Sequence, residues 1–168
     1  MSLNQSFLAE LDNEMATTRR LLERVTDASL TWGPHTKSMT MARLASHVAE
    51  LPSWIAMTLQ TAELDLSPPG GPAYVPTIHT SVQGMLEAFD GHVAAAKAAL
   101  EGAANEAFFE SWSLKAGGQT IFTMPKVACL RSFCFNHLIH HRGQLSVYLR
   151  LNDIPVPMIY GPSADESM

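Results

Sequence analysis

The sequence has few charged residues. Asp, Glu, Lys and Arg together make up 16% of its 168 residues, against roughly 25% in a typical soluble domain. The formal net charge is -5, and proteins that bind duplex nucleic acid usually carry a basic stripe instead. We therefore expect no nucleic-acid partner. A chain this lightly charged is expected to cover part of its surface with apolar segments or with a partner.

Long apolar runs and cysteine pairs are also absent. No window reaches 18 apolar residues, so we expect no membrane span. The first 15 residues contain acidic side chains and lack the apolar segment of a signal peptide. The two cysteines, Cys129 and Cys134, form no CxxC motif. We expect them to be reduced and buried, in a cytoplasmic protein without a membrane association.

Four segments carry the 3.6-residue apolar period of helices, and their length fits one domain over residues 1–168. Within the second segment, Pro52 removes a backbone hydrogen bond. It predicts either a kink near residues 48–51 or two shorter helices that meet there. The pattern predicts an all-α protein, an antiparallel or crossover four-helix bundle. The predicted helices cover residues 2–24, 40–63, 78–101 and 124–151.

Three connecting segments lack this period. Residues 66–77 are rich in proline and glycine and predict a connecting loop. Residues 102–123 contain Gly117-Gly118 between two short apolar runs, which fits a short hairpin before the last helix or an irregular loop. The tail from Ile154 contains three prolines and is expected to be extended.

Histidine is unusually frequent. Three of the seven histidines lie between positions 137 and 141. At about 100° per residue, His137 and His141 lie one turn apart on the apolar face of the last helix, about 40° from each other. At this spacing two imidazoles can bind one metal ion. His47 occupies the apolar face of the second helix and is the best-placed third ligand.

Three neutral imidazoles suit zinc, nickel, iron or copper. They leave at least one coordination position open, which is typical of catalytic rather than structural zinc sites. The alternative is that His47, His137 and His141 are hydrogen-bonded histidines of an ordinary core. A role for Cys134 beside His137 is conceivable, but buried helical cysteines are usually inert.

Other polar residues lie near this predicted site. Glu50 follows His47 by three residues, so it can orient that imidazole, act as a base, or remain a solvated carboxylate. Gln144 lies about 20° from His137 on the wheel, so it can hydrogen-bond a ligand or a group that supports one, or simply lie at the polar edge of the helix. Tyr148 shares the same face, where it either packs in the core or contacts substrate. Arg142 points away and is expected to bind another helix or a dimer partner.

The last helix also carries a second apolar set, Phe135 and Ile139, opposite its histidines. Because a bundle helix usually buries only one face, this set predicts a dimer interface or a cover provided by the hairpin.

The segment from Asn136 to Leu145, NHLIHHRGQL, resembles the last-helix motif of the DinB-like family of metal-binding four-helix bundles. Leu44-Ala45-Ser46-His47-Val48 resembles its second-helix histidine segment. Further similarity lies in Leu30-Thr31-Trp32 with Pro34, and in the tail residues 160–166. The resemblance spans nearly the whole chain.

This resemblance implies an up-down-down-up bundle, often a homodimer, with His47, His137, His141 and water around zinc, nickel or iron. It also implies a metal-dependent enzyme that activates a thiol or water, as in thiol S-transferases that use a low-molecular-weight thiol with a small-molecule substrate. If the metal activates water instead of a thiol, the implied reaction is hydrolase-like. Two alternatives remain: a metal-anchored binding or sensor bundle without turnover, and a structural protein with buried histidines.

Overall fold

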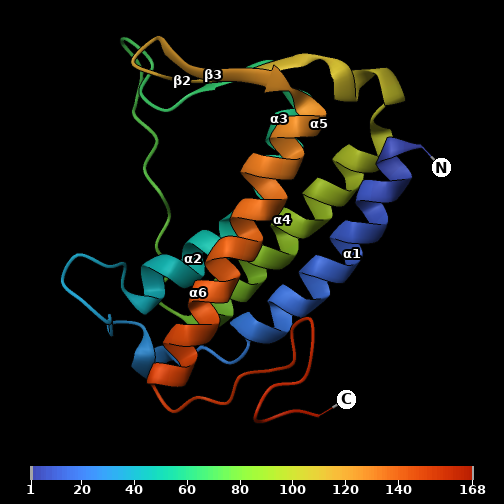
Figure 1. The fold of residues 1–168 in the computed structure, drawn as a ribbon. Coiled ribbons are helices and arrows are strands. Elements are labelled where there is room, and N and C mark those ends of the chain that lie inside the picture. The colour runs from blue at the N-terminus through green and yellow to red at the C-terminus, as the bar shows by residue number, and fades with distance from the viewer. Residues whose placement is uncertain (1, 168) are drawn as a thin grey trace.

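The computed structural model describes residues 2–167 as a bundle of four helical rods with a small sheet at one end (Figure 1). The prediction of a four-helix bundle is confirmed. The first and third rods are single helices, and the second and fourth are each built from shorter pieces. The helices are α1 (Leu3–Leu22), α2 (Met41–Glu50), α3 (Ser53–Gln60), α4 (Val82–Gly102), α5 (Lys126–Cys129) and α6 (His137–Leu151).

Side-chain caps begin the long helices. Ser2 and Gln5 form the capping box that their spacing predicts at α1. The Thr40 hydroxyl accepts a hydrogen bond from the Arg43 N–H at the start of α2. At α4 the cap is Ser81, so this helix begins at Val82, four residues later than predicted.

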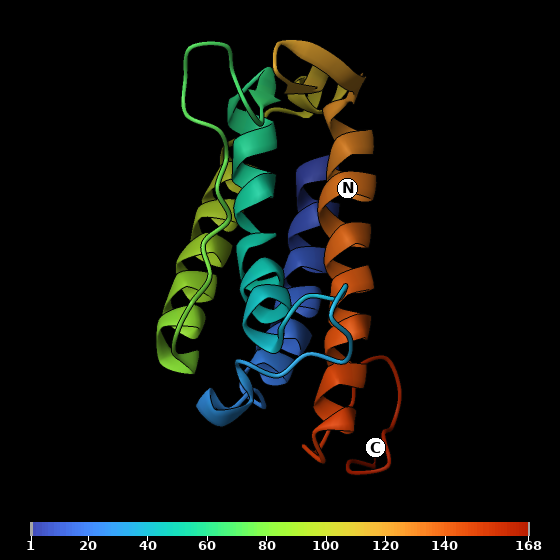
Figure 2. The ribbon, with the colours of Figure 1, turned by 90° about the vertical axis from the view of Figure 1, so that its left-hand side faces the viewer.

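Pro52 divides the second rod into α2 and α3, which confirms the alternative of two shorter helices. Because proline has no N–H, the α-helical ladder stops at this point. The N–H of Trp54 bonds to Leu51 and that of Ile55 to Pro52, both at 3.1 Å, and these tighter turns link the two helices. The two helices nevertheless follow one path along the bundle (Figure 2).

The fourth rod differs from the prediction of a continuous α-helix from residue 124. Pro125 ends a strand, and α5 begins at Lys126. Between α5 and α6, residues Leu130–Asn136 form a π-helical segment, η3. Nothing in the apolar period signals the wider π turn, which often lies at functional sites. Here it leads directly into His137.

The segment before the last rod is the predicted hairpin. It pairs β2 (Ser111–Ala116) with β3 (Gln119–Pro125) in antiparallel register. Gly117 and Gly118, at φ of 61° and 77°, form the turn that glycine favours. A third strand, β1 (Glu63–Asp65), pairs in parallel with β2 and was not predicted. It is missed because three residues show no period.

The order of the rods is the expected up-down-down-up. In Figures 1 and 2, α1 and the α5–α6 rod run in one direction, while α2–α3 and α4 run in the other. The proline-rich loop joins α3 to α4, and it returns along the length of the bundle so that these two successive rods run parallel. Both cysteines are free and buried, as predicted. No helix among residues 2–167 is long and apolar enough to cross a membrane.

Phe135 lies in the core, where its ring stacks on that of Phe7 in α1 at 5.7 Å. For Phe135 the expected cover by the hairpin or a dimer partner was wrong, because α1 packs against this residue; a dimer contact at Ile139 stays a prediction. Ile139 is half-buried.

Candidate metal centre

His47 from α2 meets His137 and His141 from α6 between the two rods. The ring centroids of the three imidazoles lie 4.7–5.0 Å apart. One nitrogen from each residue lies within 4.8 Å of the others, so the group could hold a metal ion. The structure therefore brings together the three histidines that the sequence singled out. Whether they bind a metal stays a prediction.

Each imidazole turns its Nδ1 atom away from the centre of the group. Nδ1 of His141 lies 2.7 Å from Oε1 of Gln144, and Nδ1 of His137 lies 3.3 Å from the carbonyl of Phe133. Nδ1 of His47 lies 3.8 Å from Oε2 of Glu50. At His141 and His137, the acceptor at Nδ1 favours the tautomer that leaves Nε2 free for a metal.

The spacing of the inner nitrogens also fits a metal. Nε2 of His47 and Nε2 of His137 are 3.3 Å apart. Two nitrogens at Zn–N distances of 2.0–2.1 Å and a tetrahedral angle lie about 3.3–3.4 Å apart. The distance between these two nitrogens is therefore compatible with two ligands of one metal ion, and it is also within hydrogen-bond range.

Two of the histidines, His137 and His141, are held in the neutral form that a metal needs. Burial lowers the pKa of His137 to about 4, and the nearby His141 and His47 lower it further by charge repulsion. Burial likewise lowers the pKa of His141. At neutral pH these imidazoles therefore have lone pairs available, and a metal meets little competition from protons.

An aromatic wall borders the histidines on the side of the sheet. The Trp54 indole packs edge-on to His47 and His137 and stacks on Phe133 at 4.6 Å. Phe133 belongs to the π-helical segment and also contacts Phe122 of β3. The π turn and the hairpin thus place apolar surface beside the imidazoles, which excludes water from one side of the site.

Glu50 is a half-buried neighbour of His47, not the solvated carboxylate that the sequence left open. Its Oε1 accepts a hydrogen bond from the Tyr74 hydroxyl at 2.6 Å. Burial raises the pKa of Glu50, but the nearby His47 imidazole, the hydrogen bond from Tyr74 and the charge of Arg43 bring it below the ordinary value. An ionised carboxylate therefore faces the outer nitrogen of His47.

Gln144 links two histidines of α6. Its Oε1 bonds to Nδ1 of His141, and its Nε2 lies 3.1 Å from Nε2 of His140. The sequence predicted that this amide binds a ligand or an imidazole, and it binds the imidazoles.

Two further residues take roles that the sequence allowed. The Tyr148 hydroxyl donates to the carbonyl of Met39, and its ring packs edge-on to Trp32. This favours the packing alternative over substrate contact. Arg142 points away from the histidines and bonds to α1, where its Nη1 donates to the carbonyl of Glu14 and to Thr18.

Sequence reasoning missed Arg43, which lies one helical turn before His47. Its half-buried side chain carries a buried Nη1 atom with no hydrogen-bond partner among residues 2–167. The i, i+4 spacing from His47 was the available signal. Two other histidines lie away from the site: His35 is exposed in a loop, and His92 bonds to the carbonyl of Ala49.

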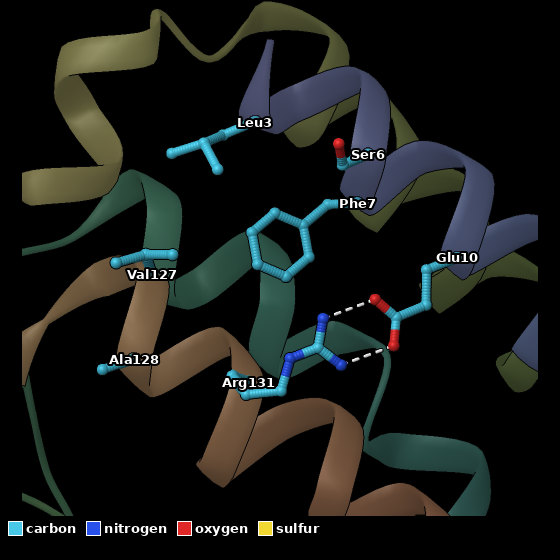
Figure 3. Close-up of a pocket in the computed structure, with 7 residues that line it drawn as sticks. All are labelled: Leu3, Ser6, Phe7, Glu10, Val127, Ala128 and Arg131. Atoms are coloured by element: carbon cyan, nitrogen blue, oxygen red, sulfur yellow. Dashed lines mark hydrogen bonds and ion pairs between the residues drawn. The ribbon is translucent and has the colours of Figure 1, made fainter. Parts of the chain in front are cut away.

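A groove of about 380 Å³ lies on the other side of the last rod, between α1 and the α5–η3 segment (Figure 3). Phe7 forms its floor, and the bidentate pair of Arg131 with Glu10 closes one end. The histidines do not line it. The lining residues are Leu3, Ser6, Phe7, Glu10, Val127, Ala128 and Arg131.

The fold and the site together define a four-helix bundle with a three-histidine cluster between its second and last rods. The profile of the DinB family matches residues 1–168, and the chain belongs to that family.

Known proteins agree with this assignment. The uncharacterized protein YrdA of Bacillus subtilis (strain 168) is 29% identical over 160 residues, which is 95% of this chain and 89% of YrdA. A DinB-like protein from Bacillus cereus ATCC 10987 superposes with a TM-score of 0.71 at 24% identity, over 93% of this chain and 97% of that one. The DinB-like protein YjoA of Bacillus subtilis gives 0.68 at 17% identity, over 92% and 97%. These two structures support the fold.

Proposed function

We propose that this protein is a metal-dependent enzyme whose His47, His137 and His141 hold one divalent transition metal, zinc, nickel or iron. The observation that carries the proposal is the geometry of the three imidazoles. Their Nδ1 atoms face outward acceptors, and the inner Nε2 atoms of His47 and His137 have the spacing of two metal ligands.

When bound, the metal supplies a positive charge that lowers the pKa of a thiol or water toward neutrality. The chain's own residues prepare the site. Glu50 and Gln144 orient His47 and His141, while Trp54 and Phe133 exclude water on one side. With three protein ligands, one position stays open for a small-molecule substrate. The reaction is therefore transfer to a low-molecular-weight thiol, or hydrolysis.

The experiment is metal analysis of untagged protein, followed by titration with zinc, nickel and iron. We expect one metal per chain in the wild type and none in His137→Ala, whereas His35→Ala in the exposed loop keeps the full content. A wild type that neither contains nor binds stoichiometric metal would overturn the proposal. Metal-loaded protein is then assayed with thiol–electrophile pairs and with ester and amide substrates.

A second candidate is a metal-anchored binding or sensor bundle without turnover. The position of Glu50 favours it, because its oxygens lie toward the Tyr74 hydroxyl and the outer nitrogen of His47, on the far side of that imidazole from Nε2. Turnover in any thiol or hydrolysis assay would exclude this candidate. Both proposals place the protein in the cytoplasm, as a homodimer with no nucleic-acid or membrane partner.

A further inference from the structure

Arg43 shares the inner face of α2 with His47. The two residues are four positions apart, which places their side chains about 40° apart and one turn from each other. The Thr40 cap fixes the backbone at this position, since its hydroxyl accepts from the Arg43 N–H at 3.3 Å. The side chain is half-buried rather than extended into solvent.

The guanidinium of Arg43 has no partner among the described residues 2–167. Its Nη1 is buried without a hydrogen bond to any residue between 2 and 167, and no described carboxylate lies within ion-pair distance. Buried donors are nearly always paired, and an unpaired one costs free energy, more so for a charged group. The missing acceptor is therefore expected from outside the chain.

Arg43 lies beside the histidine site, because it precedes His47 by one turn on the same face of α2. Glu50 does not neutralise Arg43, because its two oxygens are turned toward Tyr74 and His47.

We propose that Arg43 binds an oxyanion of the substrate, such as a carboxylate, while the reacting atom of that substrate lies at the three-histidine site. This inference rests on the proposed function and specifies its substrate class. Guanidinium groups bind carboxylates and other oxyanions through two parallel charge-assisted hydrogen bonds. A neutral substrate leaves the buried N–H unpaired, so Arg43 selects against it.

The test compares two thiols of equal chain length, 3-mercaptopropionate and its neutral alcohol analogue 3-mercaptopropanol. Each is titrated into cobalt-loaded untagged protein, and the Kd is read from the thiolate-to-cobalt absorption. We expect the wild type to bind the carboxylate thiol at least about tenfold more tightly, as one charge-assisted hydrogen bond allows. The corresponding sulfonate thiol shows whether a planar or a tetrahedral oxyanion fits better.

In Arg43→Gln the two thiols should bind within about twofold of each other, with alcohol affinity and cobalt content unchanged. Arg43→Lys should keep part of the preference for the carboxylate thiol, because lysine keeps the positive charge but cannot form two parallel hydrogen bonds. The matched control is Arg150→Gln, whose exposed side chain lies near the end of α6. Since Arg43 has no partner among residues 2–167, these variants should unfold at the wild-type urea midpoint. Arg43→Met, which keeps most of the volume, serves if Arg43→Gln does not fold.

The outcomes separate the two proposals. A wild type that binds no cobalt overturns the proposed function, and the role of Arg43 with it. Cobalt binding with equal affinity for the two thiols overturns the role of Arg43 alone. A preference that survives in Arg43→Gln also overturns it, because the carboxylate then binds the metal itself.

Discussion

The two sides of α6 differ in whether the fold neutralises the buried charged groups that lie there. On the side of α1, Arg142 is 1% exposed. Its Nη1 bonds to Glu14 and Thr18, and its Nη2 lies 2.6 Å from the Glu14 carboxylate. Tyr160 of the tail covers this group, with its ring 5.0 Å from the guanidinium. We call this region the arginine core.

On the side of α2, the histidine site contains three buried polar atoms without a hydrogen bond in the described chain. They are Nδ1 of His47, Oε2 of Glu50 and Nη1 of Arg43. In the arginine core, Nη2 of Arg142 also lacks a hydrogen bond of good geometry, but its ion pair with the Glu14 carboxylate neutralises the charge within the fold. The histidine site leaves these three polar atoms without a hydrogen-bond partner, as expected of a region that binds a metal or a substrate. Variants on the two sides should therefore affect different properties.

The largest effect is expected from Arg142→Ala. It leaves the largely buried Glu14 carboxylate without its partner, so the free energy of unfolding should fall by about 3–5 kcal/mol. Urea unfolding of the metal-free protein measures this. Arg150→Ala, which breaks the exposed pair with Asp165, is the control and should cost less than about 1 kcal/mol. A loss below about 1 kcal/mol for Arg142→Ala would show that the arginine core is not what holds α1 to α6.

The next effect is stabilisation by metal. Zinc at 100 times its Kd should raise the free energy of unfolding of the wild type by about 2.7 kcal/mol. His47→Ala should lose this gain, while Arg142→Ala, if folded, should keep it. Urea unfolding with zinc and with a chelator measures the difference. Equal stabilisation of wild type and His47→Ala would place the zinc elsewhere on the protein.

Glu50→Gln should weaken zinc binding about 10- to 100-fold, because partners behind metal ligands orient them and raise their basicity. Competition with a chromophoric chelator gives the affinity. The control Glu101→Gln, on the exposed face of α4, should leave it unchanged. An unchanged affinity in Glu50→Gln would mean that the 3.8 Å contact with His47 does not close when metal binds.

Gln144→Ala should have a smaller effect, about tenfold in zinc affinity, because it removes one acceptor from an exposed side chain. Gln144→Glu restores an acceptor at the same place and should recover the affinity. If Gln144→Glu binds zinc as weakly as Gln144→Ala, the hydrogen bond to Nδ1 of His141 is not the cause.

The smallest effect concerns the tail that covers the arginine core. A hydrogen bond from Arg150 lowers the pKa of Asp165, and one from the Met158 N–H contributes most to lowering that of Glu166. Since both values fall on folding, their stabilising contribution is present above the ordinary pKa and is lost as pH falls through the folded pKa. The tail should therefore loosen in acid, below about pH 4.

Hydrogen exchange at the amides of Val156 and Met158 reports this loosening, since these amides donate to Asp165 and Glu166. The variant Asp165→Asn with Glu166→Gln should exchange them faster already at pH 7. Protection that persists in this double variant would show that apolar contacts hold the tail.

The sequence predicted well what depends on local pattern. The apolar period located the four rods, Pro52 marked the break between α2 and α3, and Gly117-Gly118 marked the hairpin turn. The spacing of His137 and His141 placed both on one face of α6. The π turn and β1 were missed, because a π turn depends on how a whole rod packs and a three-residue strand depends on its partner.

The sequence by itself determined which side chains are available: two imidazoles one turn apart, a third on an apolar stripe, and an arginine four residues before it. Helical period decides such placement, because it acts within one element. Only the tertiary structure decided that α2 and α6 lie side by side. It also decided that Arg142 forms an ion pair with Glu14, whereas Arg43 has no partner among residues 2–167. Which charges are neutralised depends on contacts between rods, and these have no signature in the spacing along a single helix.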